Sequence, residues 1–198
     1  MKRDIFYTEG DLTLVRVSGN EIRSSLDIEF TNLHPYWDKP YIPRGEIWVS
    51  NFDSSAEVFS WFHRIKAEKS LLLDGESWHQ AYKQALRAER EYRQWDPRFQ
   101  IEDPCRDVIT YRDGMKVVRV RGEIVRTRYY LDFSLGGNHL RYHFIPPDEI
   151  WLEENLEEAE IPLILEHELV EVRHMKQGMD YNTAHQEANF AELVLRKR

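Results

Sequence analysis

The sequence has few of the features that mark secreted, membrane or nucleic-acid-binding proteins. It contains one cysteine, Cys105, which excludes an internal disulfide framework and suits a reducing compartment such as the cytoplasm. No apolar run approaches the length of a membrane span, and residues 1–4 (MKRD) do not lead into the apolar segment of a signal peptide. The formal net charge of −8 disfavours binding to phosphate backbones. We therefore expect a soluble cytoplasmic protein with no nucleic-acid or membrane partner.

The chain does contain an internal repeat. Residues 42–48 (IPRGEIW) match residues 145–151 (IPPDEIW) at a shift of 103 positions, and the same register pairs residues 15–17 (VRV) with residues 118–120 (VRV). Further matches run along both copies in this register: Gly19 with Gly122, Arg23 with Arg126, Gly75 with Gly178, Ala81 with Ala184, and Glu89 with Glu192. A register kept this long predicts a tandem duplication. We place the first copy at 1–95, a linker at 96–103 and the second copy at 104–198.

Each copy changes from strand-like to helical periodicity, which predicts an α+β fold. In the second copy, β-branched and aromatic residues favour strands at 117–133 and 139–145, with residues 136–138 (GGN) as the turn of a hairpin. A short strand at 149–152 follows. Helices are expected at 157–176 and 181–195, with Gly178 ending the first and Asp180 capping the second. The chain is thus predicted to be a tandem duplication of a small, mostly antiparallel sheet followed by a helical hairpin.

Residues able to hold a metal ion gather in this second helical hairpin. His167, Glu171 and His174 are four and three residues apart, which places them on one helical face. His185 and Glu192 are seven apart on the next helix. They border a stripe of alanines that lets the two helices approach closely. Imidazole nitrogens and carboxylate oxygens at such spacings suit zinc or another divalent transition metal, with His174, His185 and Glu192 as alternatives to complete the site.

Only the second copy retains this chemistry. At the shift of 103, Arg64 stands where the second copy has His167, Ile65 where it has Glu168, and Tyr82 where it has His185. Glu68 and Glu89, however, match Glu171 and Glu192, so both carboxylates persist in a copy without imidazoles. A structural task in both copies, such as ion pairing, explains their retention. One hypothesis is that Arg64 neutralises both Glu68 and Glu89, because buried charges must be paired.

The run His167-Glu168-x-x-Glu171, after a short strand at 149–152, resembles the His-Glu-x-x-His signature of zincin metallopeptidases. Residues 167–192 are also similar to small metallopeptidase-like proteins of phages and mobile elements. The resemblance implies that His167 is the first zinc ligand, Glu171 the second and His185 or Glu192 the third, and that Glu168 is the catalytic general base on a water molecule. Glu171 departs from the family pattern, which has histidine there. A phage origin would place the protein in the host cytoplasm or the virion.

The expected function is therefore that of a zinc-dependent hydrolase, a peptidase or amidase with its active site only in the second copy. A peptide or protein substrate would lie along the 149–152 strand by edge pairing. His139 and His143, expected on one strand face, are further candidates to approach the cleft. The alternative is a non-catalytic structural or binding protein, such as a virion or host-interaction component, in which a metal only stabilises the fold. A third reading is a magnesium-dependent phosphodiester hydrolase that uses Glu168 and Glu171.

Overall fold

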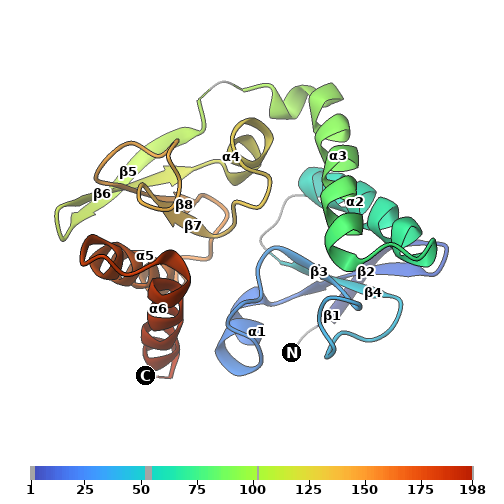
Figure 1. The fold of residues 1–198 in the computed structure, drawn as a ribbon, viewed down its shortest axis with the longest axis horizontal. Helices are drawn as coiled ribbons and strands as arrows, with labels where there is room; N and C mark the ends of the chain where they lie inside the picture. Colours follow the sequence, from blue (N-terminus) through green and yellow to red (C-terminus); the bar gives the residue numbers. More distant parts are fainter. Residues whose placement is uncertain (1–2, 52–54, 102, 198) are drawn as a thin grey trace.

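The computed structural model describes residues 3–51, 55–101 and 103–197, and forms two lobes of the same architecture (Figure 1). The first lobe contains β1 (Arg3–Glu9), β2 (Leu12–Val17), α1 (Gly19–Ser25), β3 (Leu33–Pro35), β4 (Glu46–Ser50), α2 (Ser55–Leu73) and α3 (Trp78–Trp95). After η1 (Pro97–Phe99), the second lobe contains β5 (Cys105–Arg112), β6 (Met115–Val120), α4 (Gly122–Arg128), β7 (Gly136–Asn138), β8 (Glu149–Glu153), α5 (Ile161–Lys176) and α6 (Tyr181–Arg196). The α+β class and the repeated sheet-plus-hairpin module are confirmed.

Each lobe has its own four-stranded sheet, with strand orders β1-β2-β4-β3 and β5-β6-β8-β7. The two central strands of each sheet are parallel, and both outer pairings are antiparallel. β8 therefore has a neighbour on both sides, and the expectation that a peptide could pair with residues 149–152 at a sheet edge was wrong. In the second lobe the edge strands are β5 and β7.

The predicted hairpin at 117–145 was also wrong. Its first strand stops at Val120, and α4 follows with Ile124 and Val125 fully buried. Burial of these side chains, with Val125 packed against the sheet, outweighs their preference for strands. Residues 139–148 form turns and loop rather than a strand, so His139 and His143 do not share a strand face.

The glycines expected to form a turn lie in strand β7 instead. A side chain at Gly136 would have its Cβ 2.9 Å from the Leu152 Cδ2 atom, and one at Gly137 would lie 2.7 Å from the Tyr142 ring. Glycine is needed at both positions because neighbouring groups approach the backbone closely. The two glycines that favoured a turn in the sequence are therefore explained by close packing around a strand.

Alternating side chains of β6 enter different cores on the two faces of the sheet. Met115 and Val117 pack with Leu165, Leu169 and other residues of α5. Val118 and Val120 pack on the opposite face with residues that include Val125 of α4 and Trp151. The first lobe repeats this arrangement with α2 and α1. One helix of each hairpin thus covers the sheet, which leaves the next helix to pack on its partner.

The helical hairpin of the second lobe has the expected ends. Gly178 adopts a φ of 91°, the left-handed conformation that ends many helices, and Asp180 caps α6 by accepting a hydrogen bond from the Thr183 backbone at 3.2 Å. Ala184 and Ala188 are fully buried, and α6 packs closely on α5. α5 itself begins at Ile161, four residues after the predicted start. The hairpin geometry therefore allows side chains of the two helices to meet.

The two lobes are joined by reciprocal buried ion pairs. Arg23 of the first lobe donates to Glu160 of the second at 3.0 Å, and Arg126 of the second donates to Glu57 of the first at 2.6 Å. The two arginines lie at equivalent positions of the repeat, 103 residues apart, and so do the two glutamates. Each ion pair nevertheless joins one copy to the other. In each lobe a second arginine extends the buried network. Arg196 binds both Glu160 and Glu192. Arg93 binds both Glu57 and Glu89, and Glu89 and Glu192 are the glutamates retained in both copies. Ion pairing explains why these two glutamates persist.

Within the described residues, no helix combines the length and the apolar character that a membrane span requires.

Candidate functional site

The candidate metal-binding residues converge beneath β7 from both helices of the second hairpin. His167, Glu168 and Glu171 lie on consecutive turns of α5, and His185 lies on α6. The first three are at most 8 % exposed, although Leu165, Leu169 and Val172 on the other side of α5 are buried in the sheet core. Burial of both faces of α5 follows from its position between the sheet and α6.

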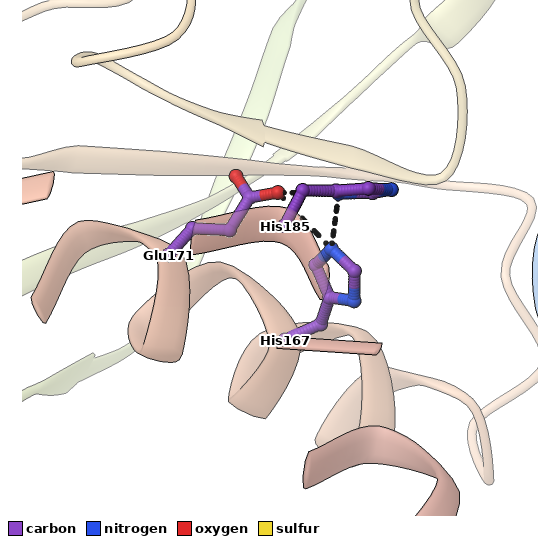
Figure 2. Close-up of side chains that lie close together, drawn as sticks. All are labelled: His167, Glu171 and His185. Carbon is purple, nitrogen blue, oxygen red and sulfur yellow. Dashed lines mark hydrogen bonds and ion pairs between the residues drawn. The ribbon is translucent and has the colours of Figure 1, made fainter. Parts of the chain in front are cut away.

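Three ligand atoms form a compact triangle (Figure 2). His167 Nε2 lies 3.1 Å from His185 Nδ1 and 3.2 Å from Glu171 Oε1, and the third edge, from His185 Nδ1 to Glu171 Oε1, is 2.6 Å. Around a tetrahedral zinc ion with bonds of about 2.0–2.1 Å, ligand atoms stand about 3.3 Å apart. Two edges already match this spacing, and the third would need to widen by several tenths of an ångström. The donor set of two imidazoles and one carboxylate therefore fits a zinc ion.

The outer nitrogen of each imidazole faces a carboxylate. His167 Nδ1 lies 3.0 Å from Glu192 Oε2, and His185 Nε2 lies 3.3 Å from Glu29 Oε1. A carboxylate favours a proton on the ring nitrogen that faces it, which leaves the lone pair on the other nitrogen. Both inner nitrogens then present lone pairs to the same point as Glu171 Oε1. In a metal-bound site, Glu192 would consequently orient His167 rather than fill a coordination position of its own.

Glu29 belongs to the first lobe, in the segment between α1 and β3, and its other contact in the site is a hydrogen bond from Asn189. Glu192 is also connected to the first lobe, because its Arg196 partner binds Glu160, which in turn binds Arg23. Both imidazoles are thus oriented by carboxylates whose positions depend on the junction between the lobes.

Asn138 of β7 positions the two carboxylates of α5. Its Nδ2 donates to Glu168 Oε2 at 2.9 Å and to Glu171 Oε2 at 2.8 Å. Its Oδ1 accepts from the backbone nitrogens of Leu140 and Arg141, both at 3.1 Å, which fixes the orientation of the amide. Glu168 is thereby held beside Glu171 in the wall of the pocket.

The charges in the cluster favour a cation at its centre. Burial lowers the pKa of His167, but hydrogen bonds with Glu171 and Glu192 outweigh burial and raise it to about 10. Burial raises the pKa of Glu171, but hydrogen bonds with His167 and His185 lower it to about 2. Burial, with the nearby charge of Glu171, raises the pKa of Glu168 to about 8. The carboxylates thus stabilise positive charge between them, which the protonated imidazoles carry and which a divalent ion could carry in their place.

A pocket of about 100 Å³ opens beside the triangle. Its walls combine the α5 and α6 site residues with the β7 glycines, with Glu29 of the first lobe, and with a cationic and aromatic group. That group consists of Arg141, Tyr142 and Tyr181. The site is therefore accessible to a small group of another molecule.

The structure brings together four of the predicted site residues directly: His167, Glu168, Glu171 and His185, with Glu192 behind His167. His174 is not part of the triangle, because it lies in the last turn of α5, beyond Glu171.

Sequence reasoning missed Asn138 and Glu29. Asn138 was assigned to a turn, and Glu29 carried no motif, although at the shift of 103 it is matched by another carboxylate, Asp132.

The first lobe has different side chains at the positions equivalent to the metal-binding residues. Arg64 Nη1 lies 3.2 Å from Glu89 Oε2, as the sequence predicted for one of its two carboxylates. Glu68 is not ion-paired with Arg64, and its Oε1 instead accepts a hydrogen bond from Trp37 Nε1 at 2.7 Å. Tyr82 takes the position of His185 and donates to Asp132 of the second lobe. This lobe therefore keeps the cross-lobe contact without the imidazoles.

Comparison with known proteins finds no matching family model, no matching curated protein and no matching solved structure.

Proposed function

We propose that the protein is a metal-dependent hydrolase, a zinc peptidase or amidase whose active site lies in the second lobe. The observation that supports this most is the convergence of His167 Nε2, His185 Nδ1 and Glu171 Oε1, with both outer imidazole nitrogens directed at carboxylates. Two imidazoles and a carboxylate, with a fourth position left for solvent or substrate, are the donor set of catalytic rather than structural zinc sites. The spacing of His167, Glu168 and Glu171 also agrees with the resemblance to zincins.

A divalent ion held here would polarise a carbonyl group and make water more acidic. The chain's own residues would supply the proton transfers. Glu168, held by Asn138 beside the triangle, would accept a proton from the attacking water and pass it to the leaving amine. Its burial excludes competing solvent, and the outer carboxylates Glu192 and Glu29 would keep both imidazoles in the ligating tautomer.

A peptide substrate would approach along β7 instead of β8. β7 is the edge strand of its sheet, and both Gly136 and Gly137 line the pocket. An extended chain can add to such an edge through backbone hydrogen bonds.

Metal content is the first test. Purified protein is expected to contain about one zinc per chain, and His167→Ala is expected to lose it, because the variant removes one of three ligands. Arg64→Ala, at the equivalent position of the first lobe, is the matched control and should keep the full zinc content. A wild-type protein that binds no transition metal would refute the proposal.

Glu168→Gln separates catalysis from binding. The variant keeps the hydrogen-bonding shape of the side chain but cannot accept a proton, so zinc content should stay at the wild-type level while peptide or amide hydrolysis is lost. Hydrolysis at the wild-type rate would exclude Glu168 as the general base. If zinc binds but neither protein hydrolyses any member of a peptide library, the alternative of a structural metal site in a binding protein is favoured.

A further inference from the structure

Arg141 is the cationic residue in the wall of the metal pocket, and it differs from the buried arginines of this protein. Those arginines each bind at least one buried carboxylate: Arg23, Arg93, Arg126 and Arg196. Among the residues that the structure describes, Arg141 makes no ion pair with a carboxylate, and its buried Nε atom has no hydrogen-bond partner. No carboxylate of the described residues therefore neutralises its charge, and its Nε donor is not used.

Aromatic rings hold the Arg141 guanidinium in place. Its Cζ lies 4.1 Å from the centre of the Tyr181 ring and 5.3 Å from that of Tyr142. Tyr181 in turn stacks on the ligand His185, with ring centres 5.5 Å apart. Stacking uses the flat face of a guanidinium, whereas its N–H donors point outward in the plane. The rings thus fix the cation in the wall of the pocket, where none of the carboxylates that the structure describes is paired with it.

The backbone ties Arg141 to the same residue that positions the catalytic carboxylates. Asn138 accepts a hydrogen bond from the Arg141 backbone nitrogen at 3.1 Å, and its amide nitrogen binds Glu168 and Glu171. At the shift of 103, the first lobe has Asp38 in place of Arg141, and Asp38 contacts His34. The first lobe therefore has a carboxylate, not a cation, at this position of the repeat.

From these contacts we infer that Arg141 binds a free carboxylate of the substrate. In such a substrate the carboxylate lies within a few ångströms of the bond that is cleaved. This inference rests on the proposed function, because it names the substrate class of the same site. A guanidinium edge matches a carboxylate through two parallel hydrogen bonds, which selects a carboxylate over an uncharged amide of the same shape. The substrate would then place its carbonyl group at the metal triangle and its carboxylate at Arg141.

Two small hydroxamates test this inference without measuring catalysis. Succinic monohydroxamate carries a metal-binding group and a carboxylate, and its primary amide analogue replaces only the carboxylate. Calorimetric titration of the zinc-loaded protein should give about tenfold tighter binding of the carboxylate probe, the scale of a charge-assisted hydrogen bond. Arg141→Met should abolish the preference, Arg141→Lys should keep part of it, and Arg87→Met, an exposed arginine on α3, should leave it unchanged.

The amide probe checks that the variant site is intact, because its affinity should be the same in wild type and Arg141→Met. A preference for the carboxylate that survives Arg141→Met, or a wild-type protein that binds both probes equally, overturns the assignment of Arg141 while leaving the zinc site in place. If the protein holds no zinc, or the zinc-loaded protein binds neither probe, the inference also fails, and the metal content shows whether the proposed function fails with it.

Discussion

Removal of the Glu29 side chain is expected to weaken zinc binding in the other lobe. Glu29 contacts His185 Nε2 at 3.3 Å and receives a hydrogen bond from Asn189, so Glu29→Ala removes the group that orients one ligand without touching any ligand. Loss of such an outer partner typically costs between about 10-fold and 100-fold in metal affinity. The contact is long and the Glu29 side chain is 52 % exposed, which places the expected loss near about tenfold.

Glu29→Gln refines the prediction. Glutamine still accepts a hydrogen bond from His185 Nε2 and preserves the ligating tautomer, so only the charge is lost, and a weakening of about two- to threefold is expected on the scale of an exposed ion pair. The zinc dissociation constant is measured by competition with a chelator of known affinity. The cobalt-substituted protein gives an independent readout, because its absorption bands report the geometry of the ligands.

Asp132→Asn is the matched control. Asp132 is the equivalent of Glu29 at the shift of 103, and it contacts Tyr82 across the same junction between lobes. This variant should leave the zinc dissociation constant and the cobalt spectrum unchanged. Equal losses of zinc affinity in Asp132→Asn and Glu29→Ala would show that any damage to the lobe junction weakens the site. Wild-type affinity in Glu29→Ala would show that Glu29 does not position His185 at all.

Two further predictions concern the buried junction between the lobes. Arg126→Met should lower the free energy of unfolding by about 3–5 kcal/mol in urea titrations, because it leaves the buried Glu153 without its ion-pair partner. Arg23→Met should cost less than Arg126→Met, because Glu160 keeps its pair with Arg196, and the exposed Arg106→Met should cost less than about 1 kcal/mol. Comparable values for all three would contradict the assigned roles. Burial raises the pKa of Glu57 and Glu160, but their arginine partners outweigh burial and hold each pKa below 4.5. Their contribution to stability is therefore complete above pH 4.5 and is lost as the pH falls through the depressed values, so the urea midpoint should fall on acidification below pH 4.5, and less steeply in Arg126→Met.

The parts of the structure that could be predicted depend on the internal repeat and on sequence patterns that act over a few neighbouring residues. The repeat register located both lobes, and the helical spacing of His167 and Glu171 placed them on one face. Gly178 and Asp180 marked the ends of the hairpin through backbone conformation and capping, both of which are local effects. The buried alanines predicted close helix packing, which is why His185 was found opposite His167.

The parts that were missed depend on contacts between distant segments. α4 contains β-branched residues and forms a helix because tertiary packing buries Ile124 and Val125, the latter against the sheet. Gly136 and Gly137 gave the same sequence signal as a turn, and only their close neighbours in the folded chain show that they belong to a strand. Glu29 and His185 are separated by 156 residues, so no spacing rule could join them.

The two lobes show how one acidic framework can be balanced by different cations. At equivalent positions, both lobes have a buried glutamate that ends the arginine network, Glu89 and Glu192, and both receive a carboxylate from the other lobe. In the first lobe the balancing charge is the guanidinium of Arg64, which is covalently attached and leaves no open coordination position. In the second lobe His167 occupies that place, and an imidazole in its ligating form is neutral. With His167 neutral, a bound ion would supply the positive charge and keep a coordination position free for substrate, so the exchange of arginine for histidine at one position of the repeat would account for the location of the proposed chemistry in one lobe only.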